Sequence, residues 1–112
     1  MILSKDSIIN TVDYEIHRVE VPRWGGEVCL RPFTAKLKDK IEQLTQTPNP
    51  NISLRAIALA GSLCNENGEL LFNDREIKSL EEKSAESVDI VLNKIFAING
   101  ITEEELEEKV KN

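Results

Sequence analysis

The residues best suited to chemistry in this chain are one histidine, His17, and two cysteines, Cys29 and Cys64. His17 and Cys29 lie in segments that we expect to face each other in a hairpin, so an imidazole base could activate a thiol nucleophile there. Such a pair also needs a cleft and a donor for the oxyanion, and the surrounding sequence indicates neither. We therefore expect His17 to be a surface or strand-edge residue and both cysteines to be reduced, small buried hydrophobes.

The sequence does not indicate a metal, cofactor or other catalytic site. One histidine and two cysteines far apart in the chain lack metal-ligand spacing, and the acidic run over 103–108 lacks the alternating pattern of a calcium loop. Gly25-Gly26 is too short to cradle a phosphate and no helix directly follows it. No Ser-His-Asp arrangement is evident. The sequence thus predicts a protein that is not an enzyme and that carries no metal or cofactor.

One aromatic residue points to binding instead. Trp24 is the only tryptophan and stands at the expected hairpin tip, between Arg23 and the Gly25-Gly26 pair. Its indole either folds back over the protein's own core or is an exposed anchor, since Trp and Arg are enriched in binding hot spots. Together with Arg31 on the return strand, these residues form the predicted protein-binding surface.

Length and charge narrow the class of protein. A chain of 112 residues is one domain's worth, and we expect a single domain over 1–112. The formal charge of −6 argues against a nucleic-acid binder, which needs a basic face for the phosphates. No apolar run is long enough for a membrane span, and residues 1–10 are too polar for a signal peptide. These features predict a cytosolic protein without nucleic-acid or membrane contacts.

The charge is distributed unevenly along the chain. Residues 34–64 carry a net charge of +2, whereas residues 65–112 carry −7. The acidic part is either a solvated face that keeps the protein soluble or a handle for a basic partner, including the 34–64 segment of another copy. Self-association is therefore one option for this chain.

The first third of the chain predicts a β-hairpin over 12–33. Apolar residues alternate with polar ones from Val12 to Ile16, and the alternation then shifts by one position to Val19 and Val21. A β-bulge near 17–18 would accommodate this shift, or else pairing begins only at Arg18. Pro22 ends the strand, a turn follows at the glycine pair, and 27–33 is the return strand.

The remaining residues, 34–112, predict a mostly helical part. The most apolar segment is 52–64, which is expected to be the central buried helix, with Gly61 marking the close approach of another backbone. Flanking helices are expected over 35–46, from 73 or 74 to about 80, over 84–98 with an end at Asn99-Gly100, and over 102–111. A short helix over 4–10 precedes the hairpin. The predicted fold class is α+β: an N-terminal β-hairpin followed by a mostly helical bundle around a central apolar helix.

Two stretches resemble one protein family. The hairpin sequence Val-Glu-Val-Pro-Arg-Trp-Gly-Gly-Glu-Val-Cys-Leu-Arg-Pro-Phe-Thr, residues 19–34, resembles the V-x-V-P-x-W-G-G-x-V-x-V-R-x-L-T pattern of tail assembly chaperones from long-tailed bacteriophages and prophages. Residues 65–74, Asn-Glu-Asn-Gly-Glu-Leu-Leu-Phe-Asn-Asp, resemble that family's D-E-D-G-x-x-L-F-x-D turn, and Lys83-Ser84 matches the Lys-Ser pair after its next helix. The chain departs from the pattern at Cys29 and Phe33, and in the basic segment 35–40.

The resemblance implies a function in the cytoplasm of a bacterial host. Proteins of this family bind the long tape measure protein and keep its apolar helical segments soluble until tail tube subunits polymerise around it. The tape measure protein, and the tail tube protein as a second candidate, are the implied partners. The family often has a longer frameshifted product, which a protein sequence does not show. Two alternatives remain: a minor tail or neck component retained in the virion, and a small thiol-dependent enzyme using Cys29 and His17.

Overall fold

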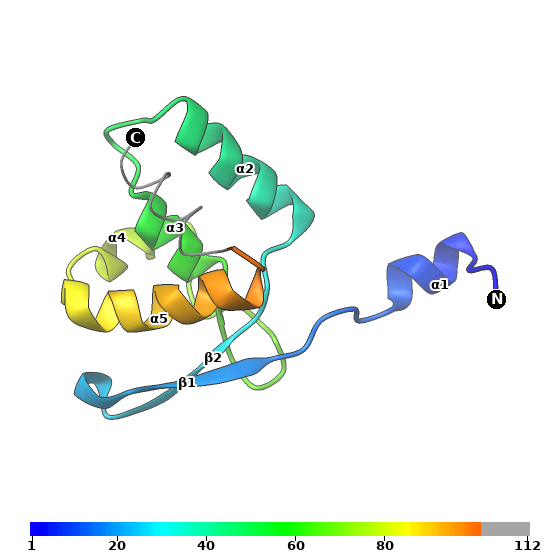
Figure 1. Ribbon diagram of the computed structural model, residues 1–112, viewed down its shortest axis with the longest axis horizontal. Coiled ribbons are helices and arrows are strands. Elements are labelled where there is room, and N and C mark those ends of the chain that lie inside the picture. Colours follow the sequence, from blue (N-terminus) through cyan, green and yellow to red (C-terminus); the bar gives the residue numbers. More distant parts are fainter. Residues whose placement is uncertain (102–112) are drawn as a thin grey trace.

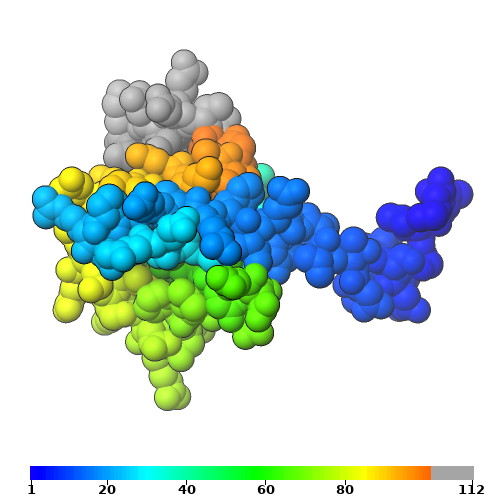
Figure 2. Space-filling model, turned by 90° about the horizontal axis from the view of Figure 1, so that it is seen from below, coloured from blue at the N-terminus to red at the C-terminus, as the bar shows by residue number. Residues whose placement is uncertain are grey.

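The helices that follow the hairpin lie on one side of a small antiparallel sheet, and the last of them packs against its first strand (Figure 1). A computed structural model describes residues 1–101. The elements are α1 (Lys5–Asn10), β1 (His17–Val21), the 3-10 turn η1 (Pro22–Trp24), β2 (Gly26–Leu30), α2 (Ala35–Gln46), α3 (Leu54–Ala60), β3 (Leu63–Cys64), α4 (Ile77–Leu80) and α5 (Ala85–Ile98). The predicted α+β class is confirmed. Helix α1 stands away from this body on an extended segment (Figures 1 and 2).

The hairpin is shorter than predicted. Five consecutive residue pairs join β1 to β2, from His17 opposite Leu30 to Val21 opposite Gly26, without a bulge. The prediction that the strand begins at residue 12 is wrong; the alternative start at Arg18 misses the first pair by one residue. Residues 12–16 have no partner on β2. The first N–H after β2, that of Arg31, donates to Ser62 O instead (3.0 Å), and the next residue, Pro32, has no N–H to donate.

A third strand was not predicted. The expected helix over 52–64 ends at Ala60, and Leu63 and Cys64 form β3, which pairs with β2 in the order β1-β2-β3. Both residues of β3 are buried. A strand of two residues is too short to show an alternating pattern in the sequence. It forms because β2, which is 34 residues away in the chain at Cys29, provides partners for its backbone hydrogen-bonding groups.

Helix α3 is the centre of the hydrophobic core, as predicted. Every residue from Ala56 to Ala60 is buried, and α3 packs against both α4 and α5. The inner face of α5 contributes Val91 and Ile95, and the hairpin contributes Val21 and Leu30, all of which are fully buried. The core therefore joins helices and sheet into one cluster.

Gly61, at the end of α3, makes room for a side chain rather than for another backbone. A Cβ at this position would collide with Cδ2 of Leu37 on α2 and would lie 3.3 Å from Ile57 O. The expectation of close backbone approach is therefore corrected: the missing side chain lets Leu37 dock and holds α2 on the core.

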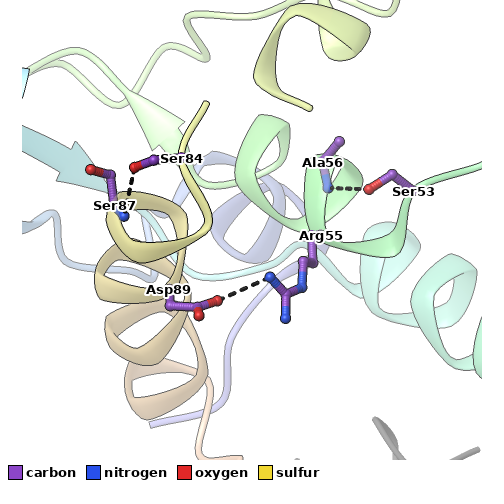
Figure 3. A network of polar contacts seen from close by, with 6 residues as sticks. All are labelled: Ser53, Arg55, Ala56, Ser84, Ser87 and Asp89. Atoms are coloured by element: carbon purple, nitrogen blue, oxygen red, sulfur yellow. Dashed lines mark hydrogen bonds and ion pairs between the residues drawn. The ribbon is translucent and has the colours of Figure 1, made fainter. Parts of the chain in front are cut away.

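A serine caps the start of each of the helices α3 and α5, and one ion pair joins the two helices (Figure 3). Ser53 Oγ accepts from Ala56 N and Ser84 Oγ accepts from Ser87 N, each at 3.2 Å. Helix α3 therefore begins at Leu54, two residues after the start of the predicted segment 52–64, and α5 begins at Ala85, one residue after its predicted start. Arg55 on α3 lies 3.1 Å from Asp89 on α5, with both side chains half-exposed. This pair aligns the two helices, although an exposed pair contributes little stability.

The other predicted helix ends are mostly confirmed. Asn73 and Glu76 form a reciprocal capping box, in which Asn73 N donates to Glu76 Oε1 and Glu76 N donates to Asn73 Oδ1, both at 3.1 Å. The helix that follows, α4, is only four residues long: it begins at Ile77, later than the predicted start at 73 or 74, and ends at Leu80 as predicted. Helix α5 ends at Asn99-Gly100, with Gly100 in the left-handed region (φ 71°). The predicted helix over 102–111 lies outside the described residues.

Candidate functional site

The hairpin tip is partly built into the body. Pro22 to Trp24 form the turn η1, and Gly25 closes it with φ +81° and a bond from its N–H to Pro22 O (3.0 Å). Trp24 is half-buried and its indole packs against the core. Arg23 is exposed and lies 3.6 Å from Glu86 at the start of α5. Of the two interpretations of Trp24, the structure supports packing on the protein's own core, and the residue keeps partial exposure.

Arg31 lies at the other end of β2 from the tip. Its Nη1 donates to Gly68 O (2.8 Å), across 37 residues of chain, and its Nε is buried without a partner among the described residues. Gly68 has φ +86°, and a Cβ there would lie 2.7 Å from the Tyr14 hydroxyl. Arg31 thus holds the 65–68 turn against the sheet. The predicted binding residues Arg23, Trp24, Gly25 and Gly26 lie together, and Arg31 is separate from them.

The thiol and imidazole side chains do not form a pair. In the β1–β2 register Cys29 lies opposite Arg18, and His17 lies opposite Leu30. Neighbouring residues of a strand point to opposite faces of a sheet, so His17 and Cys29 point away from each other. The geometry therefore gives the thiol-dependent enzyme no support.

Cys29 and Cys64 are neighbours in space although they are far apart in the chain. They are paired residues of β2 and β3, and both thiols are free. Burial raises the pKa of the Cys64 thiol, and the adjacent Cys29 raises it further, so this core thiol ionises less readily than a free one. Within residues 1–101, no group of three His, Cys, Asp or Glu side chains is placed to hold a metal ion.

The most unusual surface lies in residues 1–11, which we call the arm. Its helix α1 is capped by Ser4, whose Oγ accepts from Ser7 N (3.2 Å), and α1 contains no buried residue. Five large apolar side chains of the arm are at least 55% exposed: Met1, Ile2, Leu3, Ile8 and Ile9. Figures 1 and 2 show the arm projecting clear of the body. A cluster of exposed apolar residues on a projecting element marks a contact site for another molecule.

The sequence did not single out the arm as a candidate contact surface. The helix over 4–10 was predicted and is confirmed as α1, but its isoleucines were assigned no surface. A signal was present, because Ile8-Ile9 and Ile2-Leu3 are apolar pairs in a segment too short to cover a core. Only the three-dimensional arrangement shows that α1 buries none of its residues against the part of the chain that the structure describes.

None of the helices found in 1–101 combines the length and the hydrophobicity that a bilayer span requires. The residues described by the structure thus form a small α+β protein whose N-terminal arm exposes a cluster of large apolar side chains.

Comparison with known proteins shows which fold this is. The chain is similar to the structure of the bacteriophage HK97 tail assembly chaperone, with a TM-score of 0.63 and 16% sequence identity, over 84% of this chain and 89% of that one. The two proteins therefore share a fold across most of their lengths. No family model matches the chain, and no curated protein sequence matches it.

Proposed function

We propose that this chain is a phage tail assembly chaperone, which binds the tape measure protein in the cytoplasm of the bacterial host and keeps it soluble until tail tube subunits polymerise. The observation that carries the proposal is the shared fold with the HK97 tail assembly chaperone over most of both chains. The two sequence stretches at 19–34 and 65–74, which resemble patterns of such chaperones, support the same assignment independently of that fold.

The arm is the surface we propose for the client. Its exposed isoleucines, Ile8 and Ile9, can pack on the apolar face of a client helix, which hides that face from water. One short helix binds weakly, but many copies along one long client bind with avidity and can still be displaced. The net charge of −6 keeps the loaded complex soluble.

The hairpin tip is a second proposed contact. Arg23, Gly25 and Gly26 are exposed around the half-buried Trp24, so this end of the molecule also presents an aromatic edge to a partner. The tip and the arm lie at opposite ends of β1 (Figure 1), so substitutions at one leave the other intact.

Co-expression with the tape measure protein encoded by the same genome tests the function. We expect the soluble fraction of the tape measure protein to rise severalfold with the wild-type chain and to fall back when Ile8 and Ile9 are replaced by serine. An Ile52→Ser variant, which changes an exposed isoleucine outside the arm, is the matched control. Equal solubility with and without the chain would refute the chaperone function.

Purified virions separate this proposal from that of a minor tail or neck component. A chaperone that leaves when the tube polymerises is absent from the finished particle. Peptides of this chain at stoichiometric levels in virion mass spectra would instead establish a structural role.

A further inference from the structure

The two cysteines of the chain, Cys29 and Cys64, face each other across two strands. They are directly paired residues in the β2–β3 register, and paired residues of an antiparallel sheet project from the same face. The next pair in this register, Leu30 and Leu63, belongs to the hydrophobic core, so the two thiols lie together on the opposite face of the sheet.

The backbone at this pair has the spacing that a disulfide needs. Arg31 N donates to Ser62 O (3.0 Å), and hydrogen-bonded pairs recur at every second position, so Cys29 and Cys64 are a hydrogen-bonded pair as well. Such pairs have Cα atoms about 5.5 Å apart, within the range of about 4.4–6.8 Å found in disulfides. The Cβ atoms of facing residues are about 4.5–5.5 Å apart and a disulfide brings them to about 3.5–4.5 Å. A shift of β3, which is only two residues long, provides this difference.

The two thiols differ in exposure and in ionisation. Cys29 is partly exposed, whereas Cys64 is only 2% exposed. Burial and the neighbouring Cys29 raise the pKa of the Cys64 thiol, and the positive charge of Arg31 partly offsets that rise. A reagent from solvent therefore meets Cys29 first, with a protonated thiol beside it and a guanidinium nearby that favours a thiolate.

The 65–68 turn lies beside this thiol pair. Arg18, which is opposite Cys29 on β1, has its guanidinium 3.5 Å from Glu66, and Arg31 donates to Gly68 O at 2.8 Å. Figure 1 shows the segment that follows α3, in green, passing next to β2. A small oxidant suits a thiol in this setting better than a protein disulfide, which would have to dock on the turn.

We propose that Cys29 and Cys64 form a reversible modification site, at which a peroxide converts the two thiols into a disulfide that joins β2 to β3. In the first step the Cys29 thiolate attacks a peroxide oxygen and the O–O bond breaks. The departing hydroxide takes up the proton lost by Cys29, and Cys29 becomes a sulfenic acid. The Cys64 sulfur then attacks the Cys29 sulfur, the S–O bond breaks, and the hydroxide leaves with the Cys64 proton as water. Two electrons pass from the thiols to the peroxide, and both of its oxygens end in water.

The disulfide should be easy to reduce. Its formation draws together two strands whose hydrogen bonds hold them slightly too far apart, and strained disulfides are the readily reduced ones. The site contains no residue of the arm or of the hairpin tip. It therefore does not depend on the proposed chaperone function, and the two can fail separately.

The test treats the full, folded chain with hydrogen peroxide, blocks the remaining thiols with N-ethylmaleimide and measures the intact mass. Before oxidation we expect two adducts, one for each cysteine. After oxidation we expect no adduct and a mass lower by two hydrogen atoms, at a rate that does not change on tenfold dilution of the protein. Dithiothreitol should restore both adducts. Circular dichroism checks that the chain stays folded throughout.

Variants assign the two roles. In Cys64→Ala the reaction should stop at the Cys29 sulfenic acid, so that dimedone traps it severalfold more than in the wild type. In Cys29→Ala, Cys64 should remain open to alkylation after unfolding. The matched control combines Cys29→Ala with Glu27→Cys, which moves the outer thiol to an exposed position on the same face. Its Cα is then about 7–8 Å from that of Cys64 along a diagonal, too far for a disulfide, so this variant should give the dimedone adduct instead.

Three results would each overturn the proposal. They are a wild-type chain that keeps both alkylatable thiols or accumulates dimedone adduct as Cys64→Ala does, a disulfide found only between two chains, and a Glu27→Cys control that closes its disulfide as fast as the wild type.

Discussion

Replacing Ile8 and Ile9 together with serine is the most direct test of how this protein meets its client. The two side chains are 61% and 68% exposed, so a partner can remove most of their surface from water. Full burial of an isoleucine contributes about 1.5–3 kcal/mol, so these fractions correspond to about 1–2 kcal/mol for each residue. The double substitution should therefore weaken client binding by about 30-fold or more.

The same substitution should leave the folded state nearly unchanged. Helix α1 has no buried residue, and neither isoleucine belongs to the core cluster. Surface substitutions of this kind change the free energy of unfolding by less than about 0.5 kcal/mol, which corresponds to less than about 4 °C in Tm. A loss of binding at constant Tm is the signature of a contact surface.

Fluorescence anisotropy with a labelled amphipathic peptide from the tape measure protein measures the binding, and thermal unfolding measures the Tm. Ile52→Ser, at a 39% exposed isoleucine before α3, should change neither quantity appreciably. Unchanged affinity in the double variant would refute the arm as the client contact. A drop in Tm of about 8 °C or more would show that the arm packs on the body in solution.

Other parts of the structure give three further predictions. Trp24→Ala should lower the Tm, because the half-buried indole packs on the core; an unchanged Tm with weaker client binding would make Trp24 an exposed anchor instead. Gly61→Ala should destabilise the protein by about 1–3 kcal/mol in denaturant titration, since its Cβ displaces Leu37, and adding Leu37→Ala should recover part of this loss. The raised pKa of Cys64 means that its thiol ionises less readily in the folded state, so stability should decline as pH rises through the ordinary thiol range and toward the folded-state pKa. Alkylation near pH 8 should modify Cys29 first, and equal rates would contradict the burial of Cys64.

Local chemistry determined the helices, and it could be read from the sequence. Thr34, Ser53 and Ser84 each stand directly before an apolar-periodic segment, and each caps the helix that follows. Each cap joins a side chain to the backbone three residues later, so the local sequence is enough to predict where these helices begin. The turn at Gly25 and the apolar character of α3 could also be predicted, because both depend on residues that are close in the sequence. A hairpin followed by an apolar helix indicates the α+β class.

Which strands and side chains far apart in the sequence contact each other could be learned only from the tertiary structure. β3 exists because β2 lies beside it, and Cys29 meets Cys64 across 34 intervening residues. Arg31 was assigned to a binding surface because its type suits one, but its guanidinium reaches Gly68 in a distant turn. Residues 12–21 have the alternation of a full strand, yet β2 pairs with only His17 to Val21. Hydrophobic periodicity specifies which face of a helix or strand can be buried. Which neighbouring element covers that face follows only from the packing of the whole chain, as does the finding that α1 has no buried residue.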